Sequence, residues 1–412
     1  MFLVNIVCSA FFYLFLPFYF IERFLHKKSG GWKEHFGFVP KFDEKTIVIH
    51  GCSVGEVLAI ENLVKRLKNE FSSKKFVITT STVTGQAVAK KKYGNIVDCV
   101  TYFPFDTILS VNRFFDNINP EMIFMLETEI WPCFTLQCEK RNIPVVIISG
   151  RISDKSINSY KFFKFFFKRI FEKYSGIYTQ SEEDSKRFEA IGADRSKIKF
   201  MGNLKFGIKK NEHIIDIGQN GYRVVIAGST HGKENNFIIE AYTKATKICD
   251  NLKLILAPRH FEDIDNIVNY CLKKQLSIGY RSEGATFNQK IDVIILDTLG
   301  ELSKLYSVCD IAFIGGSLVK VGGHNPLEAV IYNKPVISGN YIFNFRDIYS
   351  ILIEYNIANI VKNQYELTQK LIQLLQTNNL CEQMENACKA VFQKQSGAED
   401  FVVNVLRETL HL

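Results

Sequence analysis

The sequence lacks the short motifs by which several common enzyme classes are recognised. Neither a P-loop nor a complete G-x-G-x-x-G occurs in its 412 residues, which argues against hydrolysis of a nucleoside triphosphate and against nicotinamide-dependent hydride transfer. The ten cysteines form no C-x-x-C pair and show no zinc-site spacing, so we interpret them as small core residues in a reducing compartment. No other cluster has metal-ligand spacing, and we expect chemistry without a metal or another cofactor.

Long blocks of one charge are also missing. The net charge is +8, but the basic residues are spread along the chain, unlike the basic arms that bind nucleic acid. This small excess of positive charge suits an anionic substrate or a membrane surface, and no nucleic-acid partner is predicted. Hydrophobic residues make up 47% of the chain and charged residues 23%, which excludes disorder, and the length suits two domains.

The N-terminal segment "MFLVNIVCSAFFYLFLPFYFI", residues 1–21, contains no charged side chain. Its length matches the ~20 residues of a bilayer-spanning helix, and it has neither the basic start nor the cleavage site of a signal peptide. Lysines and histidines follow it, so the positive-inside tendency places the rest of the chain on the cytoplasmic side. We expect a membrane-anchor helix; Asn5 and Pro17 leave a monotopic helix open, and a buried core helix is the alternative.

The remaining chain alternates short runs rich in β-branched and aromatic residues with helical patterns. Continuous apolar strands between helices predict parallel sheets covered on both faces. The alternation stops at the polar stretch 209–222 and then restarts, which predicts two doubly wound α/β domains, residues 22–209 and 210–412. The expected strands are residues 46–50, 76–80, 122–126, 145–149 and 176–180, then 224–228, 253–257, 292–296, 311–315 and 335–339.

One expected helix, residues 159–174, has an unusual composition, because it interleaves four lysines with seven phenylalanine or isoleucine residues. An aromatic face with a basic counter-face suits contact with a membrane. The alternative is a core helix with a solvated lysine edge.

In the first domain, polar motifs directly follow the expected strands, where ligands bind in open α/β sheets. Ser53 and Glu56 form a capping-box pattern ahead of an apolar helix, but Glu56 could also accept a proton. A helix N-terminus favours the ionised carboxylate, so we expect Glu56 to be a ready proton acceptor with a low pKa. Glu127 and Glu129 follow the strand 122–126 and are either an acid/base pair or helix caps. Lys205 is either a cation for substrate charge or a solvated surface residue.

In the second domain, two glycine-rich turns, "GGS" (315–317) and "GGHNPLE" (322–328), follow a strand. Such turns suit close backbone approach to a phosphate at a helix N-terminus, although Asn325 as N-cap, with Pro326 and Glu328 after it, is also good capping chemistry. Arg259 and His260 end another strand, where a guanidinium can pair bidentately with phosphate or carboxylate. These motifs favour nucleotide binding.

A series of motifs runs in order from the N-terminal segment to about residue 350. They are "SVGE" (53–56), "YFPFD" (102–106), "ETEIWP" (127–132), "GRIS" (150–153), "QSEED" (180–184), "GNLKF" (202–206), "AGSTH" (227–231), "PRH" (258–260), "DTLGEL" (297–302), "GGSLV" (315–319), "GGHNPLE" (322–328) and "FNFRDI" (343–348). Together they resemble the 3-deoxy-D-manno-octulosonic acid (Kdo) transferases of bacterial lipopolysaccharide assembly. The departures, Gly51–Cys52 ahead of "SVGE" and "GRIS" for a more usual Ala-Arg-Leu-Ser, affect no expected role.

The resemblance implies a GT-B glycosyltransferase with two facing Rossmann-like domains. It implies transfer of Kdo, with inversion and without a metal, from CMP-Kdo to the lipid A precursor (lipid IVA) at the bacterial inner membrane. Glu56 would be the general base, and Glu127 and Lys205 would stabilise the transition state. The residues expected to hold CMP are Pro258, Arg259, Leu299, Gly300, Glu301, Asn325, Pro326, Leu327 and Glu328.

The resemblance is loose after about residue 350, where the family implies a helix that returns to the first domain. Two other functions remain as alternatives. One is another GT-B enzyme that uses a UDP-sugar, and the other is a membrane-tethered nucleotide-binding module without chemistry.

Overall fold

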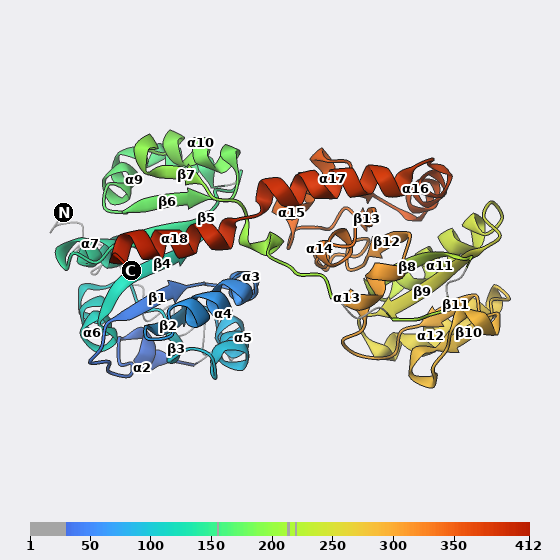
Figure 1. Ribbon diagram of the computed structural model, residues 1–412, viewed down its shortest axis with the longest axis horizontal. Helices are drawn as coiled ribbons and strands as arrows, with labels where there is room; N and C mark the ends of the chain where they lie inside the picture. The colour runs from blue at the N-terminus through green and yellow to red at the C-terminus, as the bar shows by residue number, and fades with distance from the viewer. Residues whose placement is uncertain (1–29, 155, 212–214, 219–220) are drawn as a thin grey trace. The chain divides into compact units, whose positions relative to one another are not determined.

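The computed structural model of the protein describes residues 30–154, 156–211, 215–218 and 221–412 (Figure 1). The predicted anchor, residues 1–21, lies outside these ranges. Within them, no helix combines the length and the apolar composition that a membrane span requires.

The first unit is built on a sheet of seven strands in the order β3-β2-β1-β4-β5-β6-β7. All neighbouring strands run parallel, and the central strands are buried because their apolar side chains meet helices on both faces. The strands are β1 Thr46–His50, β2 Lys75–Thr80, β3 Cys99–Tyr102, β4 Pro120–Leu126, β5 Val145–Gly150, β6 Gly176–Thr179 and β7 Ile198–Phe200.

Helices and 3-10 turns flank or connect these strands, and a hydrophobic cluster lies on each face of the sheet. They are α2 Trp32–His35, α3 Val54–Ala59, α4 Glu61–Glu70, α5 Val83–Tyr93, α6 Ile108–Ile118, α7 Pro132–Lys140, α8 Ile157–Phe162, α9 Lys164–Phe171, α10 Glu182–Ala190, η1 Arg195–Lys197 and η2 Leu204–Phe206.

The second unit contains another sheet of seven parallel strands, in the order β10-β11-β9-β8-β12-β13-β14. The prediction of two doubly wound α/β domains is therefore confirmed. The strands are β8 Arg223–Thr230, β9 Leu252–Pro258, β10 Ile278–Tyr280, β11 Val293–Ile295, β12 Ile311–Ile314, β13 Val336–Gly339 and β14 Ala358–Val361. The helices are α11 Lys233–Ala245, α12 Ile264–Lys273, α13 Leu302–Leu305, α14 Leu327–Val330, α15 Arg346–Glu354, α16 Gln364–Gln376 and α17 Leu380–Gln395, with 3-10 turns η3 Phe261–Asp263, η4 Arg281–Glu283, η5 Phe287–Gln289 and η6 Tyr306–Val308.

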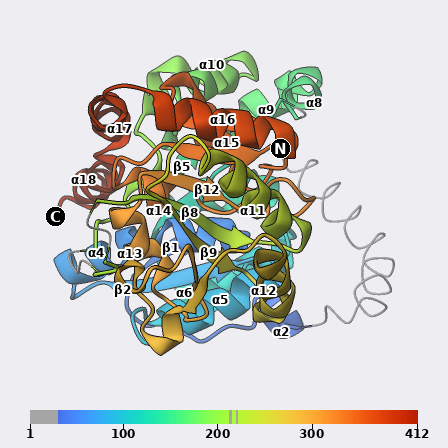
Figure 2. The ribbon, with the colours of Figure 1, turned by 90° about the vertical axis from the view of Figure 1, so that its right-hand side faces the viewer.

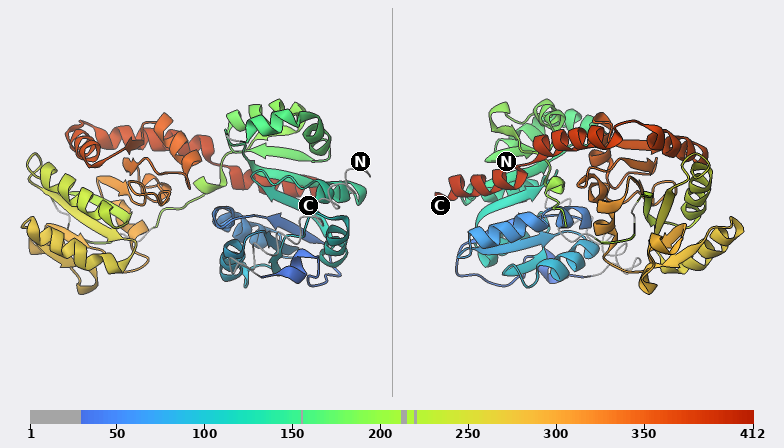
Figure 3. Two further views of the ribbon diagram at one scale, coloured as in Figure 1. Left: turned by 180° about the vertical axis from the view of Figure 1, so that it is seen from behind. Right: turned by 45° about the vertical axis from the view of Figure 1, so that its right-hand side comes forward.

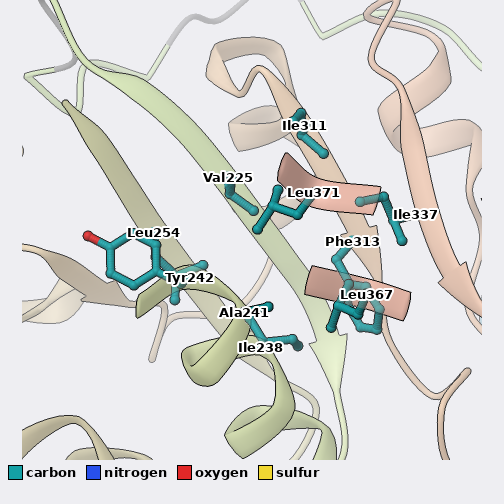
Figure 4. A pocket seen from close by; sticks show the side chains of 10 residues that line it. All are labelled: Val225, Ile238, Ala241, Tyr242, Leu254, Ile311, Phe313, Ile337, Leu367 and Leu371. Carbon is teal, nitrogen blue, oxygen red and sulfur yellow. The ribbon is translucent and has the colours of Figure 1, made fainter. Parts of the chain in front are cut away.

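The core of the second unit is tightly packed where α11 and α16 cover the sheet (Figure 4). A cavity of about 10 Å³ lies there, lined by ten residues that are apolar except for the Tyr242 hydroxyl. That hydroxyl donates a hydrogen bond to the Leu252 carbonyl oxygen at 3.0 Å. Because the space hardly holds one water molecule, it is part of the core and not a ligand site.

The last helix, α18 (Ala398–Leu410), returns to the first unit (Figures 1 and 3). Its buried residues join the same hydrophobic cluster as the apolar face of α4, and Arg407 forms an ion pair with Glu70 at 2.7 Å. The first unit therefore runs to Gly207 and adds Gln395–Leu412, and the second is Ile208–Lys394. The resemblance implied a helix that returns to the first domain, and α18 is such a helix. The domain bounds 210–412 nevertheless assigned it to the second domain, because an amphipathic face does not reveal which sheet it covers.

Candidate functional site

The strand order of the first sheet reverses between β1 and β4, which is where ligands bind in such sheets. The loop after β1 leads into α3, whose first turn carries Glu56, while Glu127 directly follows β4. Two of the expected catalytic residues therefore lie at the switch point of one sheet.

Glu56 is held by the turn that precedes its own helix. The Cys52 N–H donates a hydrogen bond to Oε2 at 2.8 Å, and the Ser53 hydroxyl donates to Oε1 at 2.8 Å. Ser53 is the N-cap residue, but its side chain accepts no hydrogen bond from the helix backbone. The predicted capping box is therefore not formed, and the carboxylate instead has a fixed orientation with 8% of the residue exposed.

Burial raises the pKa of Glu56 to about 7, and the negative charges of Glu127 and Glu129 add to this effect, whereas the hydrogen bonds from Ser53 and Cys52 oppose it. The low pKa expected from the helix N-terminus was wrong, because α3 has only six residues and desolvation outweighs its dipole. At neutral pH about half of the Glu56 carboxyls are ionised. Such a group is well matched to general base catalysis.

Glu127 and Lys205 come together in the first unit although they are far apart in the sequence. The Lys205 Nζ lies 3.7 Å from the Glu127 Oε1, and both side chains are largely buried. Lys205 belongs to η2. Its backbone N–H donates a 3.0 Å hydrogen bond to the side-chain oxygen of Asn203, which fixes the start of this turn. Because the charge of Glu127 influences the pKa of Glu56, the three expected catalytic residues form one electrostatic group.

The backbone of Glu127 is strained in a way that suits a functional position. Its φ of 53° lies in the left-handed region, at a cost of roughly 1–3 kcal/mol for a residue other than glycine. A hydrogen bond of 3.0 Å from its N–H to the Ile148 carbonyl oxygen stabilises this conformation.

His50 is a site residue that the sequence analysis missed. It ends β1 and is fully buried, with Nδ1 3.0 Å from the Thr79 hydroxyl and Nε2 3.6 Å from the Glu129 Oε2. The Trp131 ring N–H donates to the same Glu129 oxygen at 2.8 Å. The available signal was a polar residue at the carboxyl end of the apolar strand "TIVIH".

The second sheet reverses its order between β8 and β12, and Glu234 links the loops that follow these two strands. Glu234 is fully buried in α11. Its carboxylate accepts four backbone hydrogen bonds, from the N–H groups of His231 (3.0 Å), Gly316 (2.7 Å), Ser317 (2.8 Å) and Leu318 (2.6 Å). The expectation that the "GGS" turn presents its N–H groups to a phosphate is therefore wrong, because the Gly316 and Ser317 N–H groups bind Glu234 and the Gly315 N–H donates to the Gly228 carbonyl oxygen at 2.8 Å.

Three histidines and an arginine gather at the same edge of the second sheet. The Nε2 atoms of His231 and His324 lie 2.9 Å apart, and their rings stack. The ring of His260 packs edge-on against His231. Burial lowers the pKa of His324 to about 4, and the positive charges of His231, Arg259 and His260 lower it further. The Arg259 guanidinium of the cluster is exposed, and a guanidinium is always charged in proteins.

The other residues expected to hold CMP follow neighbouring strands of the same parallel sheet. Pro258 ends β9 and is buried. Leu299 is 85% exposed in the turn after β11, and Gly300 there has a φ of 85° that favours glycine. The Glu301 carboxylate accepts hydrogen bonds from the Thr298 hydroxyl and, at 3.4 Å, from the Arg281 guanidinium.

The "NPLE" turn after β12 differs from the prediction by one position. Pro326 is the N-cap residue, so α14 begins at Leu327, and the Asn325 side chain accepts a 3.1 Å hydrogen bond from the Leu327 N–H. The Leu327 side chain is fully buried, which leaves only its backbone for ligand contact. Burial also raises the pKa of Glu328. Whether these residues bind a nucleotide stays a prediction.

Comparison with known proteins shows similarity to glycosyltransferases. A family model described as 3-Deoxy-D-manno-octulosonic-acid transferase (kdotransferase) matches residues 30–208. The 3-deoxy-D-manno-octulosonic acid transferase of Haemophilus influenzae is 32% identical over 372 residues, which cover 88% of this chain and 87% of that protein. A bifunctional glycosyltransferase/methyltransferase of Fusobacterium nucleatum is 36% identical over 80% of this chain, which spans 52% of that longer protein.

Among solved structures, a UDP-N-acetylglucosamine 2-epimerase has a TM-score of 0.58 at 12% identity and covers 91% of this chain and 98% of its own. At this identity the likeness concerns the fold alone, and it agrees with the GT-B architecture of two doubly wound parallel sheets. The match to the H. influenzae protein extends over most of both sequences. The chain therefore belongs to the 3-deoxy-D-manno-octulosonic acid (Kdo) transferases, a family of glycosyltransferases.

Proposed function

We propose that the protein transfers Kdo from CMP-Kdo to the lipid A precursor (lipid IVA), with inversion at the anomeric carbon. The observation that carries the proposal is the buried carboxylate of Glu56, which has a pKa of about 7. The charge of Glu127, which forms an ion pair with Lys205, contributes to this pKa. Proton transfer from a hydroxyl is fastest when the base has a pKa near the working pH. The alternative, a nucleotide-binding module without chemistry, does not explain why the fold keeps carboxylates that are costly to bury.

In the proposed reaction, a hydroxyl of the acceptor attacks the anomeric carbon of Kdo. Glu56 takes the proton of that hydroxyl, the bond from the anomeric carbon to the phosphate oxygen of CMP breaks, and CMP leaves with the bonding electron pair. The negative charge of Glu127 stabilises the positive charge that develops on the sugar. Lys205 orients Glu127 and offsets negative charge of the substrate.

We assign donor binding to the second unit. The exposed guanidinium of Arg259 suits bidentate pairing with phosphate or carboxylate. The Glu328 carboxylate, which burial has made a better proton acceptor, suits hydrogen bonds from ribose hydroxyls. The turns at Leu299–Glu301 and Asn325–Glu328 follow strands of the same sheet as Arg259, so they complete a donor site at one sheet edge.

We further propose that residues 1–21 anchor the protein in the bacterial inner membrane, with both units on the cytoplasmic side. An acceptor with acyl chains resides in a membrane, and tethering the enzyme there restricts its search for substrate to two dimensions. The uncharged N-terminal segment and the lysines after it support this assignment.

The direct test incubates the detergent-solubilised full chain with CMP-Kdo and lipid IVA and measures the masses of the lipid products. We expect one or more mass increments of one Kdo unit, and the number of increments gives the number of sugars that the enzyme adds. No mass gain would refute the proposed reaction.

The donor is tested separately by thermal unfolding with CMP or UDP present. A ligand at 100 times its dissociation constant stabilises the folded state by about 2.7 kcal/mol. We expect CMP to raise the unfolding temperature and UDP to have little effect. A shift with UDP alone would favour the alternative of a UDP-sugar enzyme.

A further inference from the structure

Five consecutive residues of the first unit, 161–165, are exposed where α8 ends and α9 begins. Three of them are phenylalanines, and we call these three residues the Phe surface: Phe162 is 81% exposed, Phe163 56% and Phe165 72%. Figure 2 shows α8 at the rim of this unit. Exposed apolar residues are usually scattered singly, and contiguous ones indicate an interaction site.

The rest of this segment explains why the Phe surface is not simply a poorly packed part of the core. Phe166 and Phe167 of α9 are partly buried against a hydrophobic cluster, and Ile170 and Phe171 belong to that cluster. The chain departs from the helical region at Phe163, with φ −95° and ψ 23°. The single helix expected over residues 159–174 is therefore broken into two. Tyr160 of α8 also packs against the cluster, so the core explanation accounts for both helices but not for the Phe surface between them.

Positive charge surrounds the Phe surface. Residues 156–171 contain Lys161, Lys164, Lys168 and Arg169 and no acidic residue. All four cations are exposed, and the Arg169 guanidinium lies 4.3 Å from the centre of the Phe165 ring. Aromatic rings among cations are typical of surfaces that bind the boundary between anionic headgroups and acyl chains.

We propose that the Phe surface inserts into the interfacial region of an anionic bilayer, with the four cations at the lipid phosphates. A second copy of the chain is a poorer occupant, because two such surfaces would bring like charges together. The inference deepens the proposed function, since it gives the acceptor-binding unit a contact with the membrane that holds the acceptor. It does not depend on the N-terminal anchor.

The test measures the local contact and not overall membrane binding, because the full chain can also bind through residues 1–21. Phe163→Trp places a fluorescent ring in the Phe surface, and Tyr365→Trp is the matched control, since Tyr365 is an aromatic residue of similar exposure (69%) in the second unit. Each full-length variant is mixed with vesicles that contain phosphatidylglycerol and phospholipids brominated on their acyl chains. The wild-type signal, from its two tryptophans, is subtracted.

We expect the added tryptophan of Phe163→Trp to be quenched at least about twofold and that of Tyr365→Trp to be quenched little. Replacing Lys161 and Lys164 by glutamine should weaken vesicle binding at this surface by about 25-fold, at about fivefold for each cation. Equal quenching at both positions, or no excess at position 163, would overturn the proposal. Equal quenching with uncharged phosphatidylcholine vesicles would overturn the role of the cations.

A triple variant, Phe162→Ser, Phe163→Ser and Phe165→Ser, separates this proposal from the proposed function. We expect unchanged stabilisation by CMP and unchanged turnover of detergent-dispersed lipid IVA, but turnover at least about fivefold lower on lipid IVA in anionic vesicles. Loss of turnover in detergent would show that the surface serves catalysis and would overturn a membrane role. A wild-type dimer that the triple variant converts to a monomer, measured by light scattering, would identify a second copy as the occupant and also overturn it.

Discussion

Replacing Glu56 by glutamine tests both its chemistry and its energetics. The change should leave the local geometry intact, because the glutamine oxygen can accept from the Cys52 N–H while its amide donates to the Ser53 hydroxyl, which can reverse its role. Glutamine cannot accept a proton at neutral pH. We therefore expect a folded protein whose turnover falls by at least about 100-fold, within the usual range for a general base.

The stability of the same variant should depend on pH in a defined way. Glu56 has a pKa of about 7 in the folded protein and an ordinary value of 4.5, so the folded state binds more protons between these values and wild-type stability falls as pH rises through this window. The difference, 7 − 4.5 = 2.5, corresponds to about 3 kcal/mol at about 1.36 kcal/mol per pKa unit. Glu56→Gln should match wild type below pH 4.5 and exceed its unfolding free energy by about 3 kcal/mol above pH 7.

Urea unfolding at several pH values measures the stability difference, and kcat/KM across the same range measures the activity. Wild-type activity should rise as Glu56 ionises, with its midpoint near the Glu56 pKa of about 7, and should level off about one pH unit higher. Glu61→Gln is a suitable control, because hydrogen bonds from Lys65 and Lys92 lower the pKa of Glu61, so this variant should lose stability at neutral pH and keep activity. Substantial turnover by Glu56→Gln would show that Glu56 is structural, and a pH-independent stability difference would refute the burial argument.

Three further changes test other parts of the site. Lys205→Met should leave the charge of Glu127 uncompensated and raise the pKa of Glu56. The rise of kcat/KM with pH should therefore move to higher pH. An unmoved profile would contradict the electrostatic coupling of the three residues. Arg259→Gln should weaken CMP binding by roughly tenfold or more, measured by calorimetry, with unchanged unfolding because the side chain is exposed; unchanged affinity would remove Arg259 from the donor site. Glu234→Gln offers one acceptor oxygen to four N–H donors and should lower the unfolding free energy by roughly 3 kcal/mol, measured in urea; a neutral result would contradict its role in holding the loops.

The predicted strands show what local composition can reveal. All ten expected strands are present in the structure, whereas β3, β7, β10 and β14 were not predicted, and these four are the edge strands of the two sheets. A central strand is buried on both faces and reads as a continuous apolar run. An edge strand is short and partly exposed, so its sequence carries a much weaker signal.

The expected catalytic residues illustrate the same limit at the level of chemistry. The sequence indicated Glu56, Glu127 and Lys205 through their motifs, and the fold brings their charges into one group. The pKa of Glu56 was predicted in the wrong direction, because a sequence shows the helix N-terminus but not the burial that outweighs it. The hydrogen-bond partners of Glu234 could not be predicted from the sequence either, since three of its four donors lie more than 80 residues away along the chain.

The sequence by itself determined the fold class, the family motifs and the positions of most polar turns, because strand composition and local turn chemistry depend on neighbouring residues. Only the tertiary structure decided which loops meet at a switch point, which side chains of α18 pack in the first unit, and which phenylalanines of 159–174 remain exposed. Each of these depends on contacts between distant segments. The free energy of such contacts comes from surfaces that meet only after folding, so a local pattern cannot specify it.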